Sequence, residues 1–384
     1  MIYFDNAATT KLDDDILSTM LPYFTEHYGN PSSIHKMGDN SKIAIEEARR
    51  KVASALNCEN SEIYFTGSGT EADNWAIFKA VEKRKSKGKH IISTVIEHHA
   101  VLHTLQKLEK DGFEITLLPV SENGIIDINN LKKVIRDDTI LITVMFANNE
   151  IGTIMPIKEI GAIARERGIL FHTDAVQAVC SVDIDVQEMN VDMLSLSAHK
   201  FYGPKGVGAL YIKKGTGLQS FIFGGGQERK LRAGTENVAG IVGLGNAIEK
   251  GVSHLEENST YVKELRDYLI DNALQKIPHC ILNGDRKNRL PGNANFSIKF
   301  IEGESILLHL SLKGICASSG SACTSGSLDP SHVLLALGLS HEVAHGSLRV
   351  TLGHHNTKEE LDKFLEILPE IVLKLREMSP LWNE

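Results

Sequence analysis

The sequence is short of cysteine, and the few cysteines it has form no pattern. Five of its 384 residues are cysteines, all widely spaced and none in a Cys-x-x-Cys pair. An odd, scattered set does not make a disulfide framework and lacks the spacing of a zinc site, so we expect reduced thiols in a cytoplasmic protein. The five are Cys58, Cys180, Cys280, Cys316 and Cys323.

Long apolar runs and an excess of positive charge are also missing. No apolar run reaches the about 18 residues of a membrane span, and the start Met1-Ile-Tyr-Phe-Asp5 has neither the basic nor the apolar region of a secretory signal. With 49 acidic and 41 basic residues, the net charge of −8 disfavours nucleic acid or an anionic membrane as a partner. The remaining composition, 42% hydrophobic, can build a substantial core in two or three domains.

Strand-like and helix-like segments alternate through the first two thirds of the chain. This alternation predicts an α/β fold, with a mainly parallel sheet sandwiched by helices. From about residue 256, longer helices flank two strand-like runs, which predicts a smaller α+β domain. We therefore place a large domain at 15–255 and a small domain at 1–14 and 256–384. The predicted strands of the large domain are 62–65, 90–95, 113–120, 139–147 and 169–173, and its first two helices are 13–27 and 41–56.

One lysine stands out in the stretch from Ser195 to Gly208. Lys200 follows an apolar strand-like run and precedes a turn rich in glycine, so its neighbours are small or apolar. A lysine held in such a pocket can lose its proton and attack a carbonyl to form a Schiff base. An ordinary solvated loop lysine is equally compatible with this stretch alone.

Polar residues follow several other predicted strands, at the sheet edge where parallel sheets bind ligands. Gly69 and Thr70 open a helix after a glycine-rich turn, where backbone N–H groups can cradle a phosphate. Asp174 closes an apolar strand, where a carboxylate needs a cationic or N–H partner, and Gln177 follows closely. Asn149 comes directly after the longest apolar run. Each stretch has a simpler explanation that fits equally well. The glycine-rich stretch could be a plain strand–helix turn, Asp174 could be a helix N-cap, and Asn149 could belong to a simple turn.

Histidines begin the helix that follows the strand at 90–95. One imidazole among His98 and His99 could stack on a flat ring or transfer a proton. His99 and His103 stand four residues apart and could ligate a metal. No carboxylate or cysteine has the matching spacing, so we expect no metal site here.

Together, an amine for a Schiff base, an acid for a ring nitrogen, a phosphate cradle and a stacking imidazole specify pyridoxal phosphate. The chain resembles the class V, fold-type I pyridoxal-phosphate enzymes and, more narrowly, the NifS/IscS-type cysteine desulfurases. The resemblance covers essentially the whole chain. Its motifs include Asp5-Asn-Ala-Ala-Thr-Thr10, Gly29-Asn-Pro-Ser-Ser33, Asn148-Asn-Glu-Ile-Gly152, Ser197-Ala-His-Lys-Phe-Tyr-Gly-Pro-Lys-Gly206, Arg232-Ala-Gly-Thr-Glu236 and Ser379-Pro-Leu-Trp382.

The segment Ala317-Ser-Ser-Gly-Ser-Ala-Cys323-Thr-Ser-Gly-Ser327 separates a desulfurase from related enzymes. Cysteine is normally a buried small hydrophobe, and a run of glycine and serine cannot bury it well. We therefore expect Cys323 to be an accessible nucleophile, with a bystander thiol as the alternative. The resemblance implies that Cys323 takes the sulfur of L-cysteine as a persulfide and releases L-alanine.

The resemblance also implies a role for each site residue. Lys200 would bind the cofactor covalently and remove the substrate Cα proton, and Asp174 would keep the ring nitrogen protonated. His98 would stack on the ring and assist proton transfer. Arg349 would pair with the substrate carboxylate, although a surface arginine at a strand end is the simpler interpretation from residues alone. The other implied cofactor contacts are Gly69, Thr70, Asn149 (also on substrate), Gln177, Ser197, His199 and, from the other subunit of a homodimer, Thr235.

Other functions stay open at this point. An aminotransferase or selenocysteine lyase on the same fold needs no protein thiol, and a non-catalytic sulfur-carrier scaffold would not need Lys200. The sulfur-acceptor protein is also open, between iron–sulfur cluster assembly, tRNA thiolation and nitrogenase maturation. The chain ends two residues after Trp382, without the tail by which housekeeping IscS-type enzymes dock a scaffold. Cys323 could also serve as a transient iron–sulfur ligand.

Overall fold

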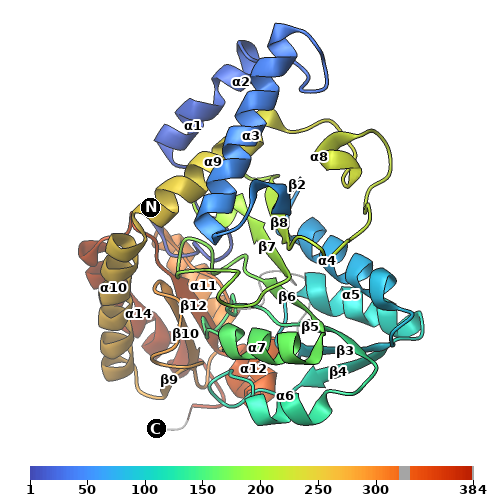
Figure 1. Cartoon of the computed structure of the whole chain (residues 1–384). Coiled ribbons are helices and arrows are strands. Elements are labelled where there is room, and N and C mark those ends of the chain that lie inside the picture. The colour runs from blue at the N-terminus through green and yellow to red at the C-terminus, as the bar shows by residue number, and fades with distance from the viewer. Residues whose placement is uncertain (320–328, 383–384) are drawn as a thin grey trace.

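A seven-stranded sheet lies at the centre of the structure, a computed structural model that describes residues 1–319 and 329–382. Its strands are β2 (Ile63–Thr66), β3 (His90–Thr94), β4 (Glu114–Leu118), β5 (Thr139–Thr143), β6 (Leu170–Asp174), β7 (Met193–Ser197) and β8 (Gly208–Ile212). The order across the sheet is β2-β8-β7-β6-β5-β3-β4 (Figure 1). All neighbours are parallel except β8, which runs antiparallel to β2 and β7. The predicted α/β fold with a mainly parallel sheet is confirmed.

Helices cover both faces of this sheet. They are α3 (Lys36–Leu56), α4 (Gly69–Arg84), α5 (His99–Lys110), α6 (Ile128–Val134), α7 (Ile157–Arg167) and α9 (Val238–Ser253), with the short α8 (Gln227–Lys230) before α9. Successive strand residues point to opposite faces, so they join different apolar cores. Leu141 packs with side chains of α4 and α5, whereas Ile142 belongs to the core that includes α3, α7 and α9. Strands buried on both faces explain the continuous apolar runs in the sequence.

The first predicted helix is broken in two. The structure has α1 (Asp14–Met20) and α2 (Pro22–Thr25) in place of one helix over 13–27. Pro22 has no N–H to donate to the preceding turn, so it ends one helix and begins the next. The second predicted helix begins earlier than residue 41, at Lys36, where the His35 ring nitrogen accepts the Gly38 N–H.

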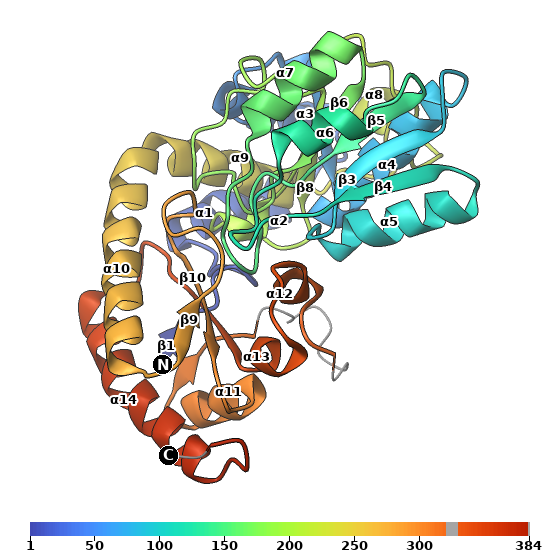
Figure 2. The same ribbon diagram turned by 90° about the horizontal axis from the view of Figure 1, so that it is seen from below.

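A second group of elements joins the first residues of the chain to the last third. β12 (Ser347–Thr351), β10 (Asn293–Ile298) and β9 (Cys280–Leu282) form an antiparallel sheet, and β1 (Ile2–Tyr3) pairs in parallel with β11 (Ile315–Cys316). Two long helices, α10 (Leu255–Lys276) and α14 (Lys358–Glu377), lie side by side against this sheet (Figure 2). The remaining helices are α11 (Gly303–Leu312), α12 (His332–Ala336) and α13 (His341–His345).

The apolar cores follow these two groups of elements. Phe4 of the N-terminal segment packs edge-on against Phe364 of α14, with ring centroids 5.5 Å apart, in a core separate from those of the large sheet. Val333 and Leu334 of α12 pack instead with the large-sheet core. The division into 15–255 and 1–14 plus 256–384 stays a prediction. Within the described ranges, every helix is too short or too polar to cross a membrane.

Candidate active site

Lys200 lies on a short 3₁₀ turn, Ala198–Lys200, directly after β7. Its Nζ donates to the carbonyl oxygens of Ala7 and Ala8, at 2.6 and 2.8 Å. These alanines belong to the segment after β1, whose Thr10 N–H also donates to the His199 carbonyl at 2.9 Å. Lys200 lines a cavity of about 390 Å³. The lysine is therefore held at a strand end beside open space, and is not an ordinary solvated loop residue.

Asp174 ends β6, the strand next to β7, and its backbone is in register with Ser195. One carboxylate oxygen accepts the Val176 N–H at 2.9 Å. Burial raises the pKa of Asp174, while the positive charges of His98 and Lys200 act in the opposite direction. A buried carboxylate of this kind is stabilised by a cationic N–H partner.

Further buried groups surround Asp174, and the sequence analysis missed them. Burial raises the pKa of Glu97 to about 8, and it raises the pKa of Asp73 as well. The ring of His172 lies between the hydroxyls of Thr143 and Ser195, at 2.8 and 3.0 Å, and burial lowers its pKa to about 3. Only Glu97 carried a signal in the sequence, as an acid that closely follows an apolar strand.

The glycine-rich turn after β2 has the close packing that a phosphate cradle requires. A Cβ added at Gly69 would lie 2.7 Å from Cγ2 of Val176, so only glycine fits there without a shift of its neighbour. Gly69 begins the sixteen-residue α4, whose first N–H groups have no partner within the helix. Thr70 is exposed in the same turn, and Ser197 is buried at the end of β7.

His199 and Gln177 are both tied to the N-terminal segment. The His199 ring lies 3.1 Å from the Thr9 hydroxyl, and burial lowers its pKa to about 4, so the ring is neutral at pH 7. The Gln177 amide nitrogen donates to the Ala7 carbonyl at 2.9 Å. Both residues are therefore positioned by the same segment that holds Lys200.

His98 caps α5, and its Nδ1 accepts the Ala100 N–H at 3.1 Å. Together with Thr70 it lines a second hollow, of about 550 Å³. The ring of His99 lies between those of His103 and His332, with centroids 4.9 and 5.0 Å away. The predicted residues thus line two hollows, one with Lys200 and one with His98.

The simpler interpretation of Arg349, a surface arginine at a strand end, is wrong. Arg349 lies within β12 with 2% of its surface exposed. Its guanidinium donates to the Asn149 carbonyl at 3.1 Å and to the Asp5 carboxylate at 3.0 Å. Within the described part of the chain, its Nε has no hydrogen-bond partner. A buried guanidinium with a donor to spare is suited to an anionic ligand.

Cys323 lies outside the described residues, but both flanks of its segment are attached to the site. Ser318 exchanges two backbone hydrogen bonds with Arg349, at 3.2 and 2.6 Å. On the other flank, the Ser331 hydroxyl donates to the buried Glu150 carboxylate, and His332 contacts the Glu97 carbonyl at 3.1 Å. In the sequence, Cys323 follows Ser318 by five residues.

Thr235 is exposed in the loop before α9. The same loop is anchored beside the glycine-rich turn, because Arg232 pairs with Glu71 of α4 through two hydrogen bonds of 2.8 and 3.0 Å. Three of the other cysteines, Cys58, Cys180 and Cys280, are unlike nucleophiles, since burial raises the pKa of each thiol, to about 12 at Cys58 and Cys280.

Comparisons with known proteins show the family of the chain. The aminotransferase class-V model matches residues 2–364. A protein named cysteine desulfurase IscS from Clostridium botulinum is 57% identical, and the match covers 100% of this chain and 97% of the relative. A protein of the same name from Methanosarcina thermophila is 58% identical, and the match covers 99% of this chain and 94% of the relative. A solved NifS-like protein superimposes with a TM-score of 0.92 at 39% identity, covering 97% of this chain and all of that one. A solved structure of SspA in complex with cysteine superimposes with a TM-score of 0.82 at 38% sequence identity, covering 93% of this chain and 100% of that one. The chain belongs to the aminotransferase class-V family.

Proposed function

We propose that this chain is a pyridoxal-phosphate-dependent cysteine desulfurase, which takes sulfur from L-cysteine, releases L-alanine and holds a persulfide on Cys323. One observation carries the proposal. Lys200 and Asp174 lie at the ends of the neighbouring strands β7 and β6, and the described flanks of the Cys323 segment are hydrogen-bonded to Arg349 and Glu150. Relatives that share 57–58% of their residues with the chain bear the name cysteine desulfurase.

The described residues fit pyridoxal phosphate. Asp174 offers a buried carboxylate of raised pKa for the pyridinium N–H, and the turn at Gly69 offers helix N–H groups for the phosphate. Lys200 is the amine that would hold the cofactor, after leaving the carbonyls of Ala7 and Ala8. When bound, the cofactor withdraws electrons from the carbon that carries the substrate amine.

The remaining cofactor and substrate contacts are those that the resemblance to cysteine desulfurases implies. We expect Thr70, Ser197 and His199 to bind the phosphate, joined by Thr235 of the partner subunit in a homodimer. His98 would cover one face of the ring. Gln177 and Asn149 would orient the ring oxygen, and Asn149 would also contact substrate. Arg349 would bind the substrate carboxylate through the donor that has no partner.

The sulfur step uses this chain's own thiol. Lys200 removes the Cα proton of the substrate, and the Cys323 thiolate attacks the substrate sulfur. A new S–S bond forms as the Cβ–S bond breaks, Cβ keeps the electron pair and takes a proton, and Cα regains the proton it lost, which gives alanine. Because a free thiol has a pKa of about 8.5, a neighbouring base such as the His98 imidazole would assist its ionisation.

Mass spectrometry tests the proposal directly. After incubation of the full chain with pyridoxal phosphate and L-cysteine, we expect the mass of one added sulfur on the peptide that contains Cys323. Cys323→Ser should remove that mass and the associated alanine production, while Cys58→Ser should change neither. If Cys323→Ala produces alanine from cysteine at the full rate, the reaction is that of a lyase or aminotransferase on this fold.

The persulfide sulfur then passes to an acceptor protein. We expect a sulfur acceptor in iron–sulfur assembly, tRNA thiolation or nitrogenase maturation. Transfer of radiolabelled sulfur from the loaded protein to purified acceptors of each class distinguishes these.

A further inference from the structure

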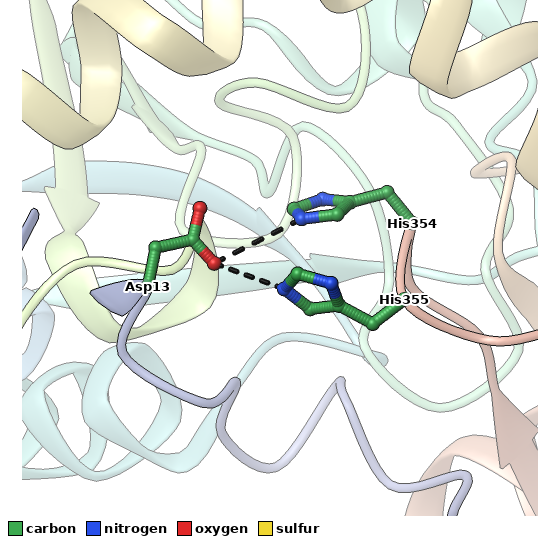
Figure 3. A group of neighbouring side chains, drawn as sticks. All are labelled: Asp13, His354 and His355. Atoms are coloured by element: carbon green, nitrogen blue, oxygen red, sulfur yellow. Dashed lines mark hydrogen bonds and ion pairs between the residues drawn. The ribbon is translucent and has the colours of Figure 1, made fainter. Parts of the chain in front are cut away.

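Three side chains that commonly bind metals meet on the wall of the Lys200 cavity. They are Asp13, His354 and His355 (Figure 3). The Asp13 Oδ1 lies 3.0 Å from the His355 Nε2 and 3.8 Å from the His354 Nε2. One ligand atom from each residue lies within 4.8 Å of the other two, and the described ranges contain no second group of three that does so.

The fold brings these residues together through Tyr202, two positions after Lys200. The Asp13 N–H donates to the Tyr202 carbonyl at 3.1 Å, and the His354 N–H donates to the Tyr202 hydroxyl at 3.1 Å. A Cβ at Gly353 would lie 2.2 Å from that hydroxyl, so glycine is required before the two histidines. The His354 ring packs 4.0 Å from the Tyr202 ring, between centroids.

The Asp13 carboxylate is oriented for a further partner. It stands at the N-cap position of α1 but makes no capping hydrogen bond with its side chain. Its Oδ2 accepts from Lys250 at 2.8 Å, which leaves Oδ1 facing the histidines. Lys250 also pairs with Asp15, so Asp13, Asp15 and Lys250 together carry a net charge of −1 beside the two histidine rings. Carboxylates that bind a metal typically accept a hydrogen bond from a neighbouring residue that does not itself touch the metal.

The donor types and their spacing suit zinc. Zinc binds imidazole nitrogen and carboxylate oxygen at about 2.0–2.1 Å, and tetrahedral angles then separate the donors by about 3.3 Å. The two distances from Asp13 Oδ1, 3.0 and 3.8 Å, lie on either side of that value. The His354 ring is partly buried with its Nε2 toward Asp13, so this nitrogen can reach the same ion. Three protein ligands leave a fourth position open to water or a ligand.

We infer that Asp13, His354 and His355 form a zinc site in the wall of the cavity that contains Lys200. The ion would tie the start of α1 to the chain that leaves β12, the strand of Arg349. The inference does not depend on the desulfurase reaction, because it concerns residues with no role in the sulfur step. The alternative is a hydrogen-bonded ion cluster that binds no metal.

Zinc titration of the full chain, saturated with pyridoxal phosphate and stripped of metal by a chelator, tests the inference. We expect calorimetry to detect one zinc equivalent that is absent from His354→Gln/His355→Gln. His355→Gln alone alters a ring whose side chain is 56% exposed, so the variant should fold and bind zinc more than about 10-fold more weakly. His254→Gln is the matched control, an exposed histidine on the same cavity that should bind like wild type.

Cobalt(II) identifies the ligands, because the cysteines of the chain also bind such metals. A nitrogen and oxygen site gives visible cobalt bands without the sulfur charge-transfer band of a thiolate site. We expect those bands in wild type and in His254→Gln, and their loss in the double histidine variant. Equal zinc binding by wild type and the double variant, or cobalt spectra with sulfur ligands only, would overturn the inference.

Discussion

A buried ion pair holds the loop of Thr235 against the large sheet. Arg49 of α3 and Glu228 of α8 form two hydrogen bonds of 2.8 Å, with 3% of each side chain exposed. Glu228 also accepts the Phe65 N–H at 2.8 Å, at the strand that leads into the glycine-rich turn. We predict that Glu228→Gln, which keeps the shape and removes the charge, destabilises the fold strongly.

The size of the effect follows from burial. Removing one partner of a buried pair costs about 3–5 kcal/mol, because the other charge stays in the interior. For a chain of 384 residues, with an unfolding entropy of about 2.1 cal/mol/K per residue, this lowers Tm by about 4–6 °C. Differential scanning fluorimetry measures the change.

An exposed ion pair provides the control. Asp138 binds Arg136 through two hydrogen bonds of 2.8 and 2.9 Å, with more than 40% of both side chains exposed. Asp138→Asn removes the charge in the same way, but solvent screens the pair, so we expect no resolvable change in Tm. Equal shifts in Tm for the two variants would refute the role of burial.

Three further predictions concern the site. Lys200→Ala should leave no pyridoxal adduct on the chain after borohydride reduction, as measured by intact mass; an adduct of unchanged yield would place the linkage elsewhere. Asp174→Asn should bind the cofactor at least about 10-fold more weakly by absorbance titration, because a charge-assisted hydrogen bond is lost; unchanged affinity would contradict that role. Burial raises the pKa of Glu97 from 4.5 to about 8, so the folded state binds the extra proton and stability falls as pH rises between these values. Glu97→Gln should flatten that fall in a series of Tm measurements against pH, and an unaltered slope would count against it.

Lys200 and Asp174 could be predicted from the sequence because each interrupts or ends an apolar strand. The sheet itself follows from the same apolar runs, although β5 ends at Thr143 and not at residue 147. A polar group that follows such a run is placed at the ligand edge of the sheet by topology alone. The local pattern therefore predicted the sheet and the positions of these two side chains, whereas their proposed roles came from the family resemblance.

Contacts between distant segments could not be predicted in this way. Asp13 and His355 are 342 residues apart, and no local pattern links them. Arg349 is a charged residue in a strand, and its burial depends on Asp5 at the other end of the chain. Asp73 lies in a helix whose sequence gives no sign that this position faces the interior.

The backbone pairing of Ser318 with Arg349 has a consequence for the choice of acceptor. Ser318, five residues before Cys323 in the sequence, is thereby fixed to the strand that contains Arg349. A persulfide on Cys323 would be open only to acceptors that can approach this part of the molecule. We therefore expect the fit of an acceptor beside β12, as well as the reactivity of its own thiol, to select which molecules receive the sulfur.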